Sequence, residues 1–342
     1  MSKERWLSLS KPERHAAATS TSSVYIIVTS PFETHPLIIL RWFLPILETV
    51  LDTKAFPYII ALGLAWGLNL VASRFGIGQF DPFIWIALRL IIAVAAFTLF
   101  YAVSPTRSWS RDPIVWRDAG LVGVFATAIP LFGFVLALQY QSAGLTALFV
   151  TTSPAITITV AHFGLEEAKL NRMTIIGILV ALSGALLIIA RGETGLPDVS
   201  AANPLGPLLI FGALFSEALV AVFIRRRMQS YDAFDVTSIR LLSAMLVAVP
   251  LALYLRPVDF SRVNLTGWGA LLFAAIISTF IAQLLSFYIT RTFGTTAFAV
   301  VGYVVPIVAI VGGVVMLGET ITFGMVGGMA LIVVGILIVN KR

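Results

Sequence analysis

The chain contains little charge. Lys, Arg, Asp and Glu together make up 12% of its 342 residues, and 58% of the residues are hydrophobic. In a typical soluble domain, charged residues make up about 25%. So few charges cannot cover a water-soluble surface, and the composition therefore predicts an integral membrane protein with several spans.

Several kinds of chemistry are missing as well. There is no cysteine, which excludes disulfides and thiolate catalysis. The three histidines, His15, His35 and His162, lack the spacing of metal ligands. The sequence has no phosphate-binding loop, no nucleophile motif and no tract of basic residues interleaved with aromatics. We therefore expect no catalytic residues, metal, cofactor or nucleic-acid partner, and an intramembrane enzyme is the least favoured function.

Long apolar runs dominate the rest of the chain. A helix that crosses the ~30 Å core of a bilayer needs about 20 apolar residues. Ten windows of this kind can be placed, at approximately 56–76, 82–103, 119–139, 144–165, 174–190, 205–226, 234–255, 267–289, 295–317 and 323–340. The predicted fold is an all-α integral membrane protein with ten transmembrane helices.

Residues 1–55 contain no such window. Ser10–Ser23 is polar, and the stretch after it mixes apolar patches with prolines and charges. Three interpretations are open: an amphipathic surface segment, a disordered regulatory tail, or translation from an upstream start that is not the native one. We favour the last, because this segment has no role in the repeat described below.

The positions of Lys and Arg predict the orientation. If the first span begins inside, eleven of these residues fall in inner loops or the C-terminal tail and four in outer loops. Cytoplasmic loops carry the excess of positive charge, so both termini are expected in the cytoplasm.

The sequence repeats itself at a nearly constant shift. A shift of 151 or 152 residues superimposes Arg74 on Arg225, Phe83 on Phe234, Arg89 on Arg240, Pro154 on Pro306, Glu167 on Glu319, Gly177 on Gly328 and Gly184 on Gly335. The predicted repeats are 56–190 and 205–340, with five spans each. Because five is odd, the second repeat enters the membrane from the opposite side, as in the inverted repeats of secondary transporters.

The stretches "AWGLNLVASRFG" (65–76), "PFIWIALRLIIA" (82–93) and "VVGYVVPIVAIVGGVVMLGE" (300–319) carry a family resemblance. With these motifs the chain resembles the drug/metabolite transporter superfamily, and specifically its ten-helix EamA-like members, over about residues 56–340. The resemblance implies a monomer or weak dimer in the bacterial inner membrane. It would move a small metabolite, amino-acid-like or related, by alternating access. A flippase for lipid-linked sugars, also found in this superfamily, is the alternative and would need a lateral opening.

Glu217 is the most unusual residue within a span. It lies about 12 residues into the sixth window, ~18 Å along a helix and near the midplane. The equivalent residue in the first repeat is Trp66. An acid at this depth is costly and functional by default, so Glu217 is a candidate for proton coupling or for binding a substrate amine. An ion pair with Arg89 or Arg240 that braces the helices is the alternative.

Other polar and kinked positions complete the predicted site. Arg89 and Arg240 are repeat mates, which we interpret as structural charges that reach the interface or cap helix ends. Pro154 and Pro306 each free a backbone carbonyl, which is tolerated in a membrane where it is re-satisfied or lines a cavity. The predicted cavity residues are Trp66, Asn69, Thr151, Thr152, Pro154, Glu217, Gln283, Tyr303 and Pro306.

Overall fold

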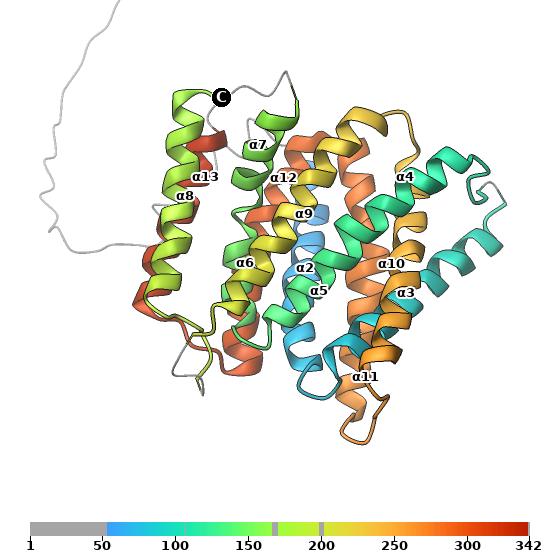
Figure 1. Ribbon diagram of the computed structural model, residues 1–342, viewed down its shortest axis with the longest axis horizontal. Coiled ribbons are helices and arrows are strands. Elements are labelled where there is room, and N and C mark those ends of the chain that lie inside the picture. The colour runs from blue at the N-terminus through green and yellow to red at the C-terminus, as the bar shows by residue number, and fades with distance from the viewer. Residues whose placement is uncertain (1–52, 106, 166–169, 198–201, 341–342) are drawn as a thin grey trace, which may run out of the picture. The chain divides into compact units, whose positions relative to one another are not determined.

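The structure, a computed structural model, describes residues 53–105, 107–165, 170–197 and 202–340. All regular structure in these ranges is helical (Figure 1). Nine helical spans are long and apolar enough to cross a membrane, and a shorter apolar helix, Phe323–Val339, follows them. The prediction of ten helical spans is confirmed. The predictions for residues 1–55 lie, except for a short turn at Thr53–Ala55, outside the described residues.

The first five spans are built from seven helical segments and a π-helix. They are α2 (Phe56–Gly76), α3 (Pro82–Val103), α4 (Pro113–Gly123), the π-helix η2 (Val124–Ala128), α5 (Ile129–Ala137), α6 (Ala143–Val150), α7 (Ser153–Gly164) and α8 (Arg172–Ala190). The third span is α4–η2–α5, and the fourth is α6 and α7, which are interrupted at Thr151 and Thr152.

The second five spans have the same order. They are α9 (Leu205–Arg227), α10 (Ala233–Leu255), α11 (Leu265–Leu272), the π-helix η3 (Phe273–Ile281), α12 (Ala282–Leu317) and α13 (Phe323–Asn340). Gly294, with φ of 85°, divides α12 into the end of the eighth span and the ninth span. A positive φ of this kind is readily adopted only by glycine.

The third span begins at Pro113, six residues before the predicted 119. The sequence window started after two charges, Arg117 and Asp118. In the structure these charges pair with each other at 2.8 Å, and Asp118 is buried. Asp112 accepts a hydrogen bond from the Ile114 N–H at 2.8 Å and so caps the new first turn. Paired charges and a cap allow the helix to start earlier than hydropathy indicates.

Three helix starts in each repeat carry a side-chain cap at matching positions. Such caps satisfy N–H groups that a helix leaves free at its first turn. The matching caps are Asp81 and Asp232, Asp112 and Asn264, and Asn171 and Thr322. The sequence repeat is therefore also a repeat of helix boundaries.

Contacts between the two halves obey a two-fold relation. The first span packs on the ninth (α2 with α12), and its mate, the sixth, packs on the fourth (α9 with α7). The second packs on the eighth (α3 with η3), and its mate, the seventh, packs on the third (α10 with α4 and η2). The mates α8 and α13 lie side by side (Figure 1).

Four glycines show that α8 and α13 run in opposite directions. A Cβ added to Gly177 would lie 2.7 Å from the Gly335 carbonyl oxygen, and one added to Gly184 would lie 2.6 Å from that of Gly328. The first glycine of α8, Gly177, therefore meets the last of α13, Gly335, and Gly184 meets Gly328, so the two helices are antiparallel. Since α8 and α13 are repeat mates, this crossing is the inversion predicted from the odd number of spans.

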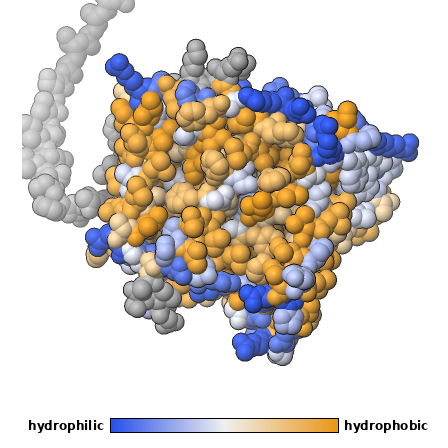
Figure 2. All heavy atoms as spheres, in the orientation of Figure 1, coloured by the Kyte–Doolittle hydropathy of each residue, from blue (hydrophilic) through white to orange (hydrophobic). Residues whose placement is uncertain are grey.

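The surface agrees with a membrane environment. Figure 2 shows a broad hydrophobic band between two edges where hydrophilic residues gather. The exposed side chains of Leu99, Leu208 and Leu246 are 62–66% accessible, although they lie within spans. Large apolar side chains at such exposure are stable in lipid rather than in water.

Candidate functional site

Two π-helices lie at equivalent places in the third and eighth spans. The segment η3 packs on α2 and α3, and η2 packs on α9 and α10. One hydroxyl group connects η3 to α2, the first span of the first repeat, and another connects η2 to α9, the first span of the second repeat. Ser278 of η3 donates to the Ala65 carbonyl at 2.8 Å, and Ser216 of α9 donates to the Phe125 carbonyl of η2. π-Helices occur frequently at functional sites.

Arg89 is buried and hydrogen-bonded. Its side chain is 7% exposed, and its Nε donates to Thr279 Oγ1 at 2.9 Å. The Thr279 hydroxyl in turn donates to the Ala274 carbonyl at 2.8 Å. The expectation that Arg89 extends to the interface or caps a helix end is therefore wrong. The side chain joins α3 to η3 inside the protein.

Glu217 and Arg240 lie close enough for their charges to interact, but they are not an ion pair. Among the described residues, no N–O distance of 4.0 Å or less joins Glu217 to Arg240 or to Arg89. The brace considered for Glu217 is thus not formed. Arg240 Nε is buried and has no hydrogen-bond partner in the described part of the chain.

Glu217 occupies an interval between two apolar clusters along α9. Leu214 belongs to a cluster shared with α6, α8 and α13, and Val220 belongs to one shared with α4 and α10. The half-buried carboxylate therefore interrupts the packing between the two halves.

Trp66 and Asn69 of α2 differ in their surroundings. The Trp66 ring meets the Phe298 ring edge to face, with 5.9 Å between centroids, within an apolar cluster of α2 and α12. Asn69 Oδ1 is buried and has no partner within the described ranges. A buried amide oxygen without a partner is costly, because it has lost its bonds to water.

The break between α6 and α7 lies at the predicted proline. The Thr151 hydroxyl donates to the Leu148 carbonyl at 2.6 Å, and the Thr152 hydroxyl donates to the Phe149 carbonyl at 2.7 Å. Both hydroxyls thus bond within the preceding turn, and neither bonds the Val150 carbonyl that Pro154 leaves without its helical donor.

The repeat mate of this proline does not break its helix. Pro306 lies inside the part of α12 that follows Gly294, which is not interrupted there. Tyr303, one turn earlier, packs in the cluster that includes Phe149 and Val150 at the end of α6. Gln283 lies half-buried in the first turn of α12.

The structure places these predicted residues in three surroundings. Trp66 lies in the α2–α12 packing, Tyr303 lies with the α6–α7 break, and Glu217 lies beside Arg240. Two polar residues were not predicted. Thr127 and Thr279 lie 152 residues apart, in η2 and η3. The repeat could have revealed them, since threonine stands at both positions.

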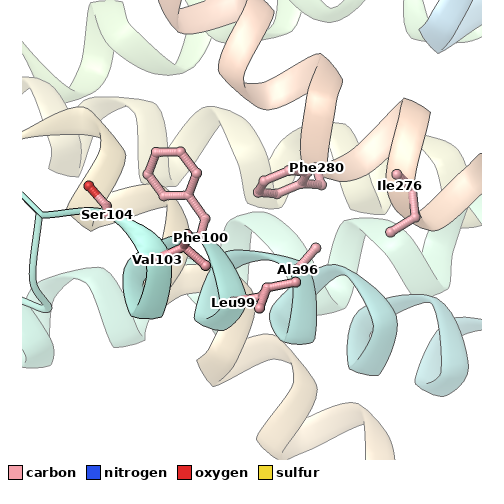
Figure 3. Close-up of a pocket in the computed structure, with 7 residues that line it drawn as sticks. All are labelled: Ala96, Leu99, Phe100, Val103, Ser104, Ile276 and Phe280. Atoms are coloured by element: carbon pink, nitrogen blue, oxygen red, sulfur yellow. The ribbon is translucent and has the colours of Figure 1, made fainter.

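A groove of about 470 Å³ lies between α3 and η3 (Figure 3). Phe100 and Phe280 enter it from the two helices, with ring centroids 6.5 Å apart. Its full lining is Ala96, Leu99, Phe100, Val103, Ser104, Ile276 and Phe280. With one hydroxyl among seven side chains, this groove does not supply the polar cleft that a sugar headgroup needs.

Glu319 connects the two halves of the fold at the predicted outer end. It is 6% exposed and accepts hydrogen bonds from the Ala143 N–H at 2.7 Å and the Gly144 N–H at 3.3 Å. It follows Gly318, whose φ of 67° ends α12. Its carboxylate therefore caps α6 across the two halves. Its repeat mate Glu167 lies outside the described residues.

We expect Glu319→Ala to lower the free energy of unfolding by about 1–3 kcal/mol, because two buried N–H groups lose their acceptor. Glu319→Gln, which keeps one acceptor oxygen, should lose less.

Burial raises the pKa of Glu319, although the Ala143 and Gly144 N–H groups oppose this. The protonated Glu319 carboxyl therefore adds to the free energy of unfolding at a pH below the pKa that it has in the unfolded chain. This contribution is lost as the pH rises through its pKa in the folded protein. Denaturation in detergent against pH measures both effects. Equal stability of wild type and Glu319→Ala would contradict the cap.

Comparison with known proteins gives consistent matches. The model of the EamA-like transporter family matches residues 53–190 and again 204–341. An uncharacterized transporter of Archaeoglobus fulgidus is 24% identical over 280 residues, covering 81% of this chain and 95% of the relative. A probable amino-acid metabolite efflux pump of Salmonella typhimurium is 26% identical over 285 residues, covering 80% and 91%.

A solved crystal structure shares the fold. It superimposes with a TM-score of 0.58 at 19% sequence identity, and the match covers 84% of this chain and 97% of the other. At this identity the likeness concerns the arrangement of helices.

Proposed function

Because the chain belongs to the EamA-like transporter family, we propose that it moves a small, amino-acid-like metabolite across the bacterial inner membrane by alternating access. The observation that carries the proposal is the two-fold relation of the contacts. The contact of α2 with α12 has its counterpart in that of α9 with α7, and the contact of α3 with η3 has its counterpart in that of α10 with α4 and η2. Two inverted repeats related in this way can exchange arrangements and so open first to one side and then to the other.

The proposed substrate class follows from the polar groups within the spans. Glu217 can accept hydrogen bonds from an ammonium group, and Arg240 can donate to a carboxylate. A zwitterion presents both groups. The name of the Salmonella typhimurium relative, an amino-acid metabolite efflux pump, supports the same class. The protein acts in this proposal as a monomer or weak dimer, with both termini in the cytoplasm.

The driving force in this proposal is a gradient, since the sequence has no phosphate-binding loop for ATP. Glu217 is the coupling candidate. It changes its protonation or its partner as the two halves move, because it faces Arg240 without being paired to it.

A thermal-shift screen of the purified protein tests the substrate class. We expect at least one amino acid, at a concentration well above its dissociation constant, to raise Tm by about 2 °C or more. Sucrose at the same concentration is the control for a nonspecific solute effect. If no amino acid shifts Tm while the protein scrambles lipid-linked sugars in vesicles, the proposal is wrong and the flippase is correct.

A further inference from the structure

The same arginine and threonine pair occurs once in each repeat. Arg89 lies seven residues after the start of α3, and Arg240 lies seven residues after the start of α10. Thr279 lies in η3, which faces α3, and its mate Thr127 lies in η2, which faces α10. We refer to Arg89–Thr279 as the outer pair and to Arg240–Thr127 as the inner pair, from their positions in the predicted orientation.

The two pairs are in different states. In the outer pair, Arg89 Nε donates to Thr279 Oγ1 at 2.9 Å. In the inner pair, Arg240 Nε and Thr127 Oγ1 are both buried, and neither has a partner in the described ranges. Buried polar atoms without partners are rare and costly. Arg240 Nε and Thr127 Oγ1, which lack partners, are therefore the repeat equivalents of Arg89 Nε and Thr279 Oγ1, which bond to each other.

The helices that carry the inner pair are already in contact. A Cβ added to Gly123 would lie 3.0 Å from the Arg240 Cα and 2.7 Å from the Ser243 Cβ. Thr127 follows Gly123 by about one π-helical turn, so the two residues lie on neighbouring parts of one face. The inner pair can therefore form by a local adjustment of α10 and η2.

A charge distinguishes the surroundings of Arg240 from those of Arg89: Glu217 lies within electrostatic reach of Arg240. Its charge attracts Arg240, whereas the equivalent residue of the first repeat is the uncharged Trp66, which packs against Phe298. Arg89 has no such competitor and bonds to Thr279.

We propose that the two pairs are alternative gates, such that the Arg240–Thr127 hydrogen bond forms when the Arg89–Thr279 hydrogen bond breaks. The inference rests on the proposed function, because only alternating access requires the repeats to exchange arrangements. In the described structure the outer pair is bonded and the inner pair is not.

The absence of cysteine allows a direct test with the full chain. Nitroxide labels on Ile114→Cys and Ala233→Cys report the distance between the exposed starts of α4 and α10. We expect Thr279→Val, which removes the acceptor of the outer pair, to shift the populations about tenfold or more toward the shorter distance in nanodiscs. Adding Thr127→Val should reverse this shift, because each state then lacks one hydrogen bond.

Two controls separate a gate from a merely structural contact. Thr279→Ser keeps the hydroxyl and should behave as wild type. Thr98→Val removes a hydroxyl that bonds only within α3, to the Val94 carbonyl, and should leave the distances unchanged. The proposal is overturned if Thr279→Val gives no shift, or if Thr127→Val fails to reverse it. Since no substrate is needed, these results are independent of the transport assays.

Discussion

Glu217→Gln should abolish the stimulation of transport by a pH gradient. A difference of one pH unit supplies about 1.4 kcal/mol per proton, enough for about a tenfold concentration ratio of a coupled solute. Glutamine has nearly the same shape but does not titrate, so the variant should equilibrate the solute without concentrating it. The measurement is uptake into proteoliposomes with and without an imposed pH gradient.

The matched control is Glu193→Gln, which removes an acid in the loop after α8, beside Arg191 at 3.4 Å. It should retain the pH stimulation. If Glu217→Gln keeps both the flux and its dependence on pH, Glu217 is a structural residue. If Glu217→Gln lowers the rate of transport but a pH gradient still stimulates that rate by the same factor as in wild type, Glu217 is not the coupling residue.

Gly184→Leu should destabilise the fold more than the other substitutions considered. The added side chain meets the Gly328 carbonyl oxygen and the backbone nitrogen of Ile332, 2.9 Å from its Cβ. Backbone cannot move aside as a side chain can, so α8 and α13 must separate. We expect a loss of about 3 kcal/mol, the upper end of the usual range for overpacking, measured as the midpoint of unfolding in detergent.

Gly212→Leu in α9 is the matched control, because no atom of a neighbouring helix in the described structure lies within 4 Å of its added Cβ. It should be as stable as wild type or slightly more stable, since leucine favours helix more than glycine does. Equal loss of stability in the two variants would show that the α8–α13 contact has no special role.

The transmembrane architecture could be predicted from the sequence because it depends on strong, local signals. Apolar windows locate the spans, and the repeat of Gly177 and Gly184 in Gly328 and Gly335 indicates paired helices. The start of α4 could not be predicted, because Asp118 is buried against a neighbour far along the chain, Tyr231, whose hydroxyl donates to it at 3.2 Å.

The candidate site was less predictable for a similar reason. Glu217 and Pro154 stand out in an apolar sequence, and the structure places Glu217 within electrostatic reach of Arg240 and Pro154 at a helix break. The π-helices leave no mark in the sequence, since η2 and η3 have ordinary apolar composition. The bond between Arg89 and Thr279 spans 190 residues, so neither hydropathy nor local spacing could reveal it.

Solute counterflow tests the central claim most directly. Proteoliposomes are loaded with an amino acid identified by thermal shift and diluted into a trace of the labelled compound. Alternating access predicts a transient accumulation of label above its equilibrium level, because the carrier returns inward loaded with label while unlabelled solute leaves. Label that rises only to equilibrium, at a rate that internal solute does not change, would contradict the claim and would indicate a channel-like path.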